Sequence, residues 1–290
     1  MQWGAGKTFQ KVAGENYEIE HILEWQMVTK FFDWLSKDKY KSARQFPNPA
    51  PLGKNKVDFC TYWKQTWDTP AFVISANSKR APKGLTAKTH LAYQYPGKDP
   101  VFNKEFVWLQ EDLNAPAKQH MWTRKKTNQI YGLTKAKTAI RRNPTDAATQ
   151  AMRAKYLLGA VKYMKDSTVE RYFIAQKKRI GEALDQIDNA LPNAPTNKGR
   201  KPWTKQDLKK HWNEYMNDAF TKAKSRTDNT MDTMIAELEA KWVMAGAKKP
   251  AGAKGKTSTA QTTLVRQIKA LKSEWLKQKR GPNAWTQPNW

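Results

Sequence analysis

The sequence has almost no cysteine and little histidine. Cys60 is the single cysteine among 290 residues, and there are 4 histidines. A disulfide framework and a Cys-rich zinc site are therefore excluded, and so is a cage of several histidines around a metal. Long apolar runs are also missing, since no stretch approaches the roughly 18 residues that a transmembrane helix needs. The N-terminal residues lack the apolar core of a signal peptide, so we expect action in the cytoplasm or nucleus, with delivery from a secreted precursor left open.

Acidic residues are scarce relative to basic ones. The chain has 26 Asp and Glu against 52 Lys and Arg, which gives a formal net charge of +26. It also has 13 Trp, 10 Tyr and 10 Phe, which a disordered polycation would lack, so we expect a folded protein. A field of this sign attracts polyanions, and nucleic acid is the expected partner. An acidic protein, a membrane surface and simple solubility are the alternatives.

The hydrophobic pattern predicts an α+β fold that is predominantly α-helical. Apolar residues recur at spacings of three and four along several segments, as on one face of a helix. A small β element is expected around residues 56–76, where aromatic and β-branched residues alternate with turn signals. The predicted helices cover 17–37, 103–122, a pair within 145–191, about 204–244 and about 262–280. Tyr17 to Ile19 could instead end a short strand, and Thr145 and Thr204 are expected helix caps.

Proline, glycine and lysine content suggests the domain boundaries. Residues 1–192 are predicted to form the main α+β domain, and 193–202 to be a linker. A basic, helical C-terminal region is expected at 203–290, with a flexible segment at 245–261 and a tail at 281–290.

An acidic cluster around one histidine, in the segment 17–25, is out of character for so basic a chain. If this segment is helical, Glu20 and Glu24 lie four residues apart and His21 and Glu24 lie three apart on one face. A carboxylate and an imidazole that face a core must be paired, and such a pair can transfer protons. The alternatives are a buried His–Glu hydrogen bond that fixes packing, or a solvated acidic first turn favoured by the helix dipole.

The same residues carry a family resemblance. Glu20-His21-Ile22-Leu23-Glu24 resembles the segment that opens the HNH (ββα-metal) motif of nuclease toxin domains. It is also similar to a segment in the C-terminal regions of fungal killer-toxin-like chitinases. Further matching stretches are Phe59-Cys60 with Tyr62, Leu113-Asn114 with Lys118, and Leu184 to Asp188.

The resemblance implies roles for single residues. His21 would be the general base and Glu20 a ligand of a divalent metal, for which Mg²⁺ or Mn²⁺ is expected. Glu24 is counted as a catalytic residue because it belongs to the same cluster and not because of the resemblance. No Asn-then-His pair follows at the usual short distance, so His90 would have to serve as a second metal ligand, or His120 with Asn114 would complete the site from afar. The catalytic carboxylate motif of chitinases is absent, so chitin cleavage is not implied.

Two basic segments are the predicted contacts with nucleic acid. Residues 123–142 contain seven Lys and Arg and no acid, and residues 245–290 contain ten against one acid. Tyr131, Trp275, Trp285 and Trp290 lie among them and could stack on bases. A solvated helix face and a solubilising tail are the alternative. The residues expected to bind nucleic acid are Arg124, Lys125, Lys126, Lys135, Lys137, Arg141, Arg142, Lys269, Lys272, Lys277, Lys279 and Arg280.

These observations predict a basic, nucleic-acid-targeting domain of the toxin or effector type. The first hypothesis is a metal-dependent nuclease that hydrolyses phosphodiesters. The second is a non-catalytic protein that binds or packages nucleic acid, and the third is an effector that targets a protein. No sequence-reading signature is present, so little sequence preference is expected. Whether the protein is an enzyme stays open at this point.

Overall fold

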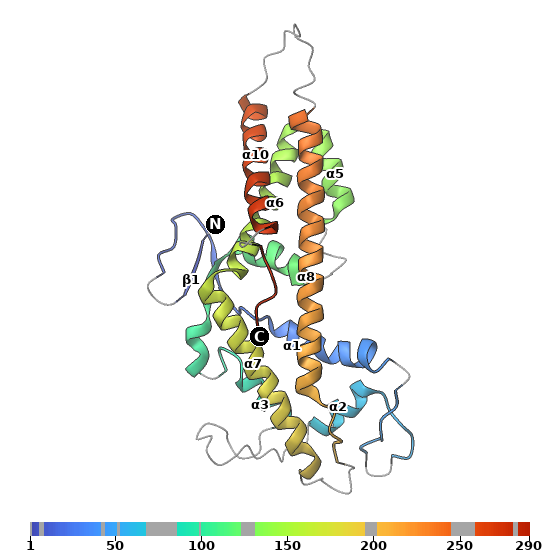
Figure 1. The fold of residues 1–290 in the computed structure, drawn as a ribbon. Coiled ribbons are helices and arrows are strands. Elements are labelled where there is room, and N and C mark those ends of the chain that lie inside the picture. The colour runs from blue at the N-terminus through green and yellow to red at the C-terminus, as the bar shows by residue number, and fades with distance from the viewer. Residues whose placement is uncertain are drawn as a thin grey trace. The chain divides into compact units, whose positions relative to one another are not determined.

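The structure, a computed structural model, confirms the predicted fold class. It describes residues 2–5, 9–41, 44–50, 53–67, 86–98, 100–122, 131–194, 202–244, 259–280 and 284–290. Figure 1 shows that helices dominate the fold. They make up 72% of it, and three strands form one small antiparallel sheet in the order β1-β3-β2. None of the helices in these ranges is long and apolar enough to cross a membrane.

All strands of the described ranges lie in the first 110 residues, and the elements that follow them are helical. The strands are β1 (Trp3–Ala5), β2 (Tyr17–Glu20) and β3 (Val107–Gln110). The α-helices are α1 (Trp25–Trp34), α2 (Phe59–Trp67), α3 (Ala87–Tyr93), α4 (Gln119–Trp122), α5 (Leu133–Arg142), α6 (Pro144–Met164), α7 (Ser167–Ala190), α8 (Leu208–Leu238) and α10 (Thr259–Lys279). Shorter 3-10 and π-helical segments are η1 (Leu35–Lys39), η2 (Pro100–Glu105), η3 (Leu113–Lys118), η5 (Leu191–Asn193) and η7 (Glu239–Met244).

The chain divides into two compact units, and each unit is built from separate stretches of sequence. The first unit comprises Met1–Glu20, Trp108–Glu170 and Ala219–Asn289. The second comprises His21–Val107 and Arg171–Asp218, together with Trp290. The predicted division into 1–192, 193–202 and 203–290 stays a prediction. Residues 195–201 of the expected linker, 245–258 of the expected flexible segment and 281–283 of the tail lie outside the described residues.

Packing of α6 against α5 and α10 forms the core of the first unit. α6 begins where the side chain of Asn143 accepts a hydrogen bond from the N–H of Asp146, with Pro144 in the first turn. The cap is therefore Asn143 and not the predicted Thr145. The buried side chains of this core come from α5, α6, α10 and the end of α8, and they are Ile140, Ala147, Ala151, Leu238, Leu264 and Ile268.

Aromatic side chains form the core of the second unit. Phe31 of α1 meets Trp212 of α8 edge to face, with ring centroids 5.4 Å apart, and Phe32 meets Trp67 of α2 in the same way at 5.2 Å. Edge-to-face contact is favourable because the positive edge of one ring meets the negative face of the next. Both tryptophans of these pairs are fully buried, so they serve the packing of this unit.

A buried carboxylate determines where α8 begins. Asp188 near the end of α7 accepts hydrogen bonds from the Trp203 indole at 2.7 Å and from the backbone N–H of Gln206 and Leu208 at 2.8 and 3.1 Å. These bonds satisfy backbone groups that a helix start leaves without partners. The N-terminal anchor of α8 is therefore Asp188 from a neighbouring helix, and the predicted cap, Thr204, does not serve in this role.

The placement of the β element around 56–76 is wrong for most of its described residues. Residues 59–67 form helix α2, Val57 makes only an isolated β-bridge with Phe46, and residues 68–76 lie outside the described residues. The buried positions of α2, Phe59, Tyr62 and Thr66, recur at spacings of three and four, as a helix requires. The β strands lie elsewhere, and β3 falls within the stretch 103–122 that was predicted to be helical.

Candidate functional site

Glu20, the predicted metal ligand, ends β2 and is paired inside the first unit. The Lys118 ammonium of η3 donates a hydrogen bond to the Glu20 carboxylate, and the two side chains are 0% and 6% exposed. Burial lowers the pKa of Lys118 well below its ordinary value. The charge of the Glu20 carboxylate therefore balances the buried ammonium of Lys118.

His21 packs among aromatic rings in the second unit. Its ring stacks on Tyr95 with centroids 5.1 Å apart and meets the edge of Phe106 at 4.8 Å. The ring Nε2 lies 3.3 Å from the carbonyl oxygen of Pro96, to which it donates a hydrogen bond when protonated. Burial lowers the pKa of His21, and this hydrogen bond opposes the effect. The neutral imidazole is thus favoured, as expected for a packed ring.

Glu24 stands directly before α1. Burial raises the pKa of its carboxyl to about 7, against the opposing charge of Lys30. Glu24 also adds to the high pKa of Tyr95, so Glu24 and His21 both lie near this tyrosine. The structure therefore brings two of the three predicted catalytic residues together around Tyr95, whereas Glu20 turns to Lys118.

The helical relations expected within this cluster do not exist. Residues 21–24 lie between β2 and α1, so the three- and four-residue spacings of Glu20, His21 and Glu24 do not place them on one helix face. Ile22 and Leu23 are both fully buried, and the N–H of Leu23 donates to Gln176 at 3.0 Å. Residues 21–24 therefore reach the interior as the connection between a strand and a helix, not as a turn of the helix.

His90 and His120 have separate partners. His90 on α3 is buried, and its Nε2 lies 3.0 Å from the Gln186 side-chain oxygen. Burial lowers the pKa of His90. The Nε2 of His120 lies 3.0 Å from the Thr230 hydroxyl, and burial lowers the pKa of His120 to about 4, assisted by the charge of Arg226.

The residues present do not fit the predicted metal. Nowhere in the described ranges do three or more His, Cys, Asp or Glu side chains gather into a group that could hold an ion. The two expected ligands of Mg²⁺ or Mn²⁺ have other partners, Lys118 for Glu20 and Gln186 for His90. Asn114 donates to Glu18 at 2.7 Å instead of completing a site. No catalytic step through a metal follows from this arrangement.

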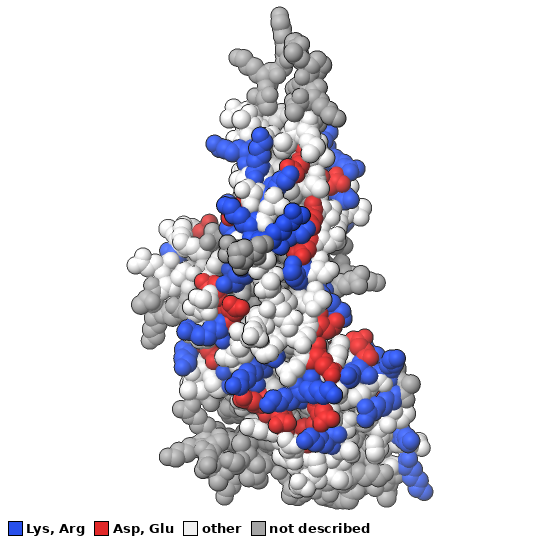
Figure 2. All heavy atoms as spheres, viewed as in Figure 1, with Lys and Arg blue, Asp and Glu red and all other residues white. Residues whose placement is uncertain are grey.

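Most of the described cations that were expected to bind nucleic acid form ion pairs within the first unit. Arg124, Lys125 and Lys126 lie outside the described residues. Six others pair with carboxylates: Lys137 and Arg141 with Glu237, Arg142 with Asp146, Lys272 with Glu239, Lys277 with Glu274, and Lys279 with Asp232. Figure 2 shows basic and acidic side chains next to each other on the face in view. These pairs reduce the charge that each cation can offer to a partner.

Four cations lie in a line along α10, and only Lys277 among them belongs to the paired set. We call Arg266, Lys269, Lys277 and Arg280 the α10 stripe, and all four are exposed. Since each residue turns a helix by about 100°, their spacings of 3, 8 and 3 place them on one face. The buried residues Leu264, Ile268, Leu271 and Trp275 occupy the opposite face.

Three members of the α10 stripe make no ion pair with any described residue. They are Arg266, Lys269 and Arg280, while Lys277 lies 2.8 Å from Glu274. The backbone N–H of Arg280 donates to Leu276, so the helical path continues to this residue. Sequence analysis missed Arg266, although its three-residue spacing from Lys269 could have indicated it. Lys135, the last member of the expected set, lies on α5 and interacts with other groups.

Comparison of the chain with protein-family models, with curated proteins and with solved structures finds no match. The resemblance to HNH nucleases and to killer-toxin-like chitinases therefore stays a hypothesis that depends on the few residues quoted for it.

Proposed function

We propose that the protein binds nucleic acid without strong sequence preference and that the α10 stripe is its principal contact. The observation that carries this proposal is the exposed line of Arg266, Lys269 and Arg280, which no described carboxylate neutralises. Lys and Arg side chains contact phosphates wherever they occur along a strand, so such a line binds without reading bases.

The charge of the first unit supports the same function. This unit contains 28 Lys and Arg against 13 Asp and Glu, a net charge of +15. Arg280 lies 14 residues beyond Arg266, so the α10 stripe is about 21 Å long at 1.5 Å per residue. Phosphates follow one another every 3.4 Å or so along one strand of a duplex, so the stripe can accompany roughly six of them.

The contacts of the acidic cluster favour binding over catalysis. A nuclease of the predicted kind needs a carboxylate that can hold a metal and an imidazole that can reach a water molecule. Glu20 is engaged with buried Lys118, and the His21 ring is packed against Tyr95 and Phe106. We therefore favour the non-catalytic hypothesis over the metal-dependent nuclease.

The test compares two triple variants of the full chain. Arg266→Gln, Lys269→Gln and Arg280→Gln together remove three charges of the α10 stripe. The matched control is Lys64→Gln, Lys205→Gln and Lys210→Gln, which removes three exposed charges of the second unit that also make no ion pair with a described residue. Binding to a fluorescent 20-nucleotide duplex is measured by anisotropy from low to physiological salt.

We expect the stripe variant to weaken binding at every salt concentration. Each phosphate contact contributes about 0.9 to the slope of log K against log salt, so the slope should become shallower by about 3. The control should keep the slope of the original protein. Absence of binding at low salt, or an equal loss in both variants, would contradict the proposal. Hydrolysis of the duplex that EDTA abolishes would restore the nuclease hypothesis.

A further inference from the structure

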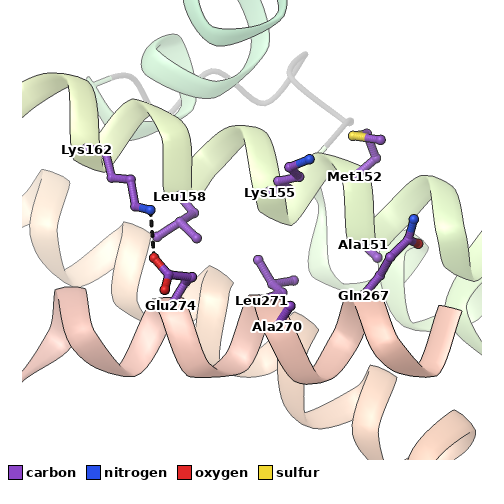
Figure 3. Close-up of a pocket in the computed structure, with 9 residues that line it drawn as sticks. All are labelled: Ala151, Met152, Lys155, Leu158, Lys162, Gln267, Ala270, Leu271 and Glu274. Carbon is purple, nitrogen blue, oxygen red and sulfur yellow. Dashed lines mark hydrogen bonds and ion pairs between the residues drawn. The ribbon is translucent and has the colours of Figure 1, made fainter. Parts of the chain in front are cut away.

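A groove between α6 and α10 lies beside the α10 stripe in the first unit. Its cavity volume is about 210 Å³. Figure 3 shows that Leu158 and Leu271 occupy its middle and that Lys162 and Glu274 stand at one end, joined by an ion pair of 2.8 Å. The remaining lining residues are Ala151, Met152, Lys155, Gln267 and Ala270.

The size of the groove suits one group of a larger ligand. Pockets that enclose a whole drug-sized molecule have volumes of about 300–1,000 Å³. A cavity of about 210 Å³ is smaller, so it holds a single ring or side chain while the remainder of the ligand stays outside. The floor is aliphatic, and it therefore favours an apolar or flat group over a charged one.

Cations lie along both sides of the groove. Lys155 on the α6 side is exposed and makes no ion pair with a described residue. On the α10 side, Lys269 directly precedes the lining residue Ala270. Lys277 lies one helical turn beyond the lining residue Glu274 and contacts it at 2.8 Å. A ligand seated in the groove must therefore carry negative charge on either side of its flat or apolar group.

We propose that the groove receives one unstacked base of a single-stranded nucleic acid, with the flanking phosphates held by Lys155 and the α10 stripe. This inference rests on the proposed function and adds to it a preference for single strands. A base has a flat, largely apolar face, and its neighbours along the strand each bring one phosphate. In a duplex the bases are paired and stacked, so the α10 stripe can bind the backbone but the groove stays unused.

The ion pair between Lys162 and Glu274 supplies polar atoms that can hydrogen-bond the edge of the base. Glu274 accepts hydrogen bonds from Lys162 and Lys277, and these contacts lower its pKa to about 2. A base that enters between Leu158 and Leu271 places its edge toward this ionised carboxylate and the Lys162 ammonium. Both groups can hydrogen-bond a base edge, since every base edge carries donors or acceptors.

The test uses three fluorescent 20-mers that carry the same backbone charge on each strand. They are oligo-dT, an abasic oligonucleotide of equal length, and a duplex. Burial of about 40 Å² of one base against the aliphatic floor, at about 25 cal/mol per Å², contributes about 1 kcal/mol, which corresponds to roughly fivefold in affinity. We expect the full chain to bind oligo-dT at least about fivefold tighter than the abasic strand at the same salt concentration.

Ala270→Phe fills the groove and should remove this difference while binding of the abasic strand and the duplex is kept. The matched control is Ala236→Phe, which adds the same ring to an exposed alanine of α8 outside the groove. Met152→Ser removes an exposed apolar lining residue without adding bulk. It should independently reduce the preference for oligo-dT over the abasic strand. Thermal melting of each variant shows that the fold is intact.

The outcomes separate the two proposals. Equal affinity of the original protein for oligo-dT and for the abasic strand overturns the groove inference and leaves the α10 stripe in place. The groove inference is also overturned if both Ala270→Phe and Met152→Ser still bind oligo-dT more tightly than the abasic strand. Failure to bind any of the three 20-mers at low salt overturns the proposed function itself. If an acidic, leucine-containing peptide binds with dependence on Ala270 and oligo-dT does not, the groove is a site for protein.

Discussion

Lys118 and Glu20 form an ion pair that is shielded from water, although 97 residues separate them in the sequence. Their side chains are 0% and 6% exposed, and burial lowers the pKa of Lys118. Removal of one partner leaves the other charge buried, which typically costs about 3–5 kcal/mol. We expect Glu20→Gln to lower the free energy of unfolding in urea by an amount of this order.

The matched control for Glu20→Gln is Glu18→Gln, because Glu18 is exposed on the same strand. It should change the free energy of unfolding by less than about 0.5 kcal/mol. The double variant Glu20→Leu with Lys118→Met removes both charges and should recover most of the loss. A stable Glu20→Gln single variant would show that the pair does not hold the interior of the first unit.

The raised pKa of Glu24 predicts how stability depends on pH. Because burial raises this pKa from 4.5 to about 7, the folded protein holds a proton that the unfolded chain releases between these values. The contribution of Glu24 to the free energy of unfolding is therefore fully present below pH 4.5 and is lost as the pH rises to about 7. The full shift corresponds to about 3 kcal/mol at most.

Glu24→Gln should remove this part of the pH dependence. We expect the urea midpoint of the variant, relative to that of the original protein, to increase between pH 4.5 and 7. His21, His90 and His120 act in the opposite direction in the same range, since their lowered pKa values favour the folded state at higher pH. The urea midpoint is therefore plotted against pH for Glu24→Gln and for the original protein. Two parallel curves would contradict the assignment to Glu24.

Substitution of His21 distinguishes packing from catalysis. His21→Ala removes the ring contacts with Tyr95 and Phe106, so we expect a lower melting temperature and a loss of about 1–3 kcal/mol in stability. His21→Gln, which keeps a hydrogen-bonding group, should lose less. Unchanged melting, together with loss of an EDTA-sensitive hydrolysis that the original protein shows, would instead identify His21 as the general base.

Glu274→Gln should strengthen binding to nucleic acid. The Glu274 carboxylate accepts hydrogen bonds from Lys162 and Lys277, and it competes with phosphates for both ammonium groups. Its loss frees two cations, so we expect tighter binding to every oligonucleotide and a slope of log K against log salt that is steeper by up to about 2. Glu111→Gln is a control for charge alone, because Glu111 is an exposed acid of the first unit that pairs with no described cation. Weaker binding by Glu274→Gln would contradict a role for these lysines.

The long helices could be predicted because their apolar spacing is regular over many turns. α6, α7, α8 and α10 all lie where the three- and four-residue pattern placed them. The segment at 17–25 is different, because a strand, a turn with two buried residues and a helix follow one another within a few positions. Their apolar residues happen to match the helical spacing. Periodicity in a short window therefore could not separate the two arrangements.

The candidate site could be predicted only in part, because its contacts are not local. The partner of Glu20 is Lys118, and the partner of Lys279 is Asp232, and neither pairing is visible in the sequence. Counting charges located the basic segments. The charge count could not show which cations are already paired. Lys272 pairs with Glu239, whereas Lys269 makes no ion pair with a described residue. The position of each carboxylate in the fold decides which cations remain available.

The buried face of α10 has a consequence for the stripe on its opposite face. Leu264, Ile268, Leu271 and Trp275 are spaced 4, 3 and 4 residues apart, and this register alone decides which way the cations point. One residue inserted after Leu276 would leave these four anchors seated but rotate everything beyond by about 100°. The stripe would then be cut into two pairs that face different directions, although no basic residue had been lost. Deletions and insertions in α10 can thus change the surface as strongly as a charge reversal, while composition and net charge stay almost the same.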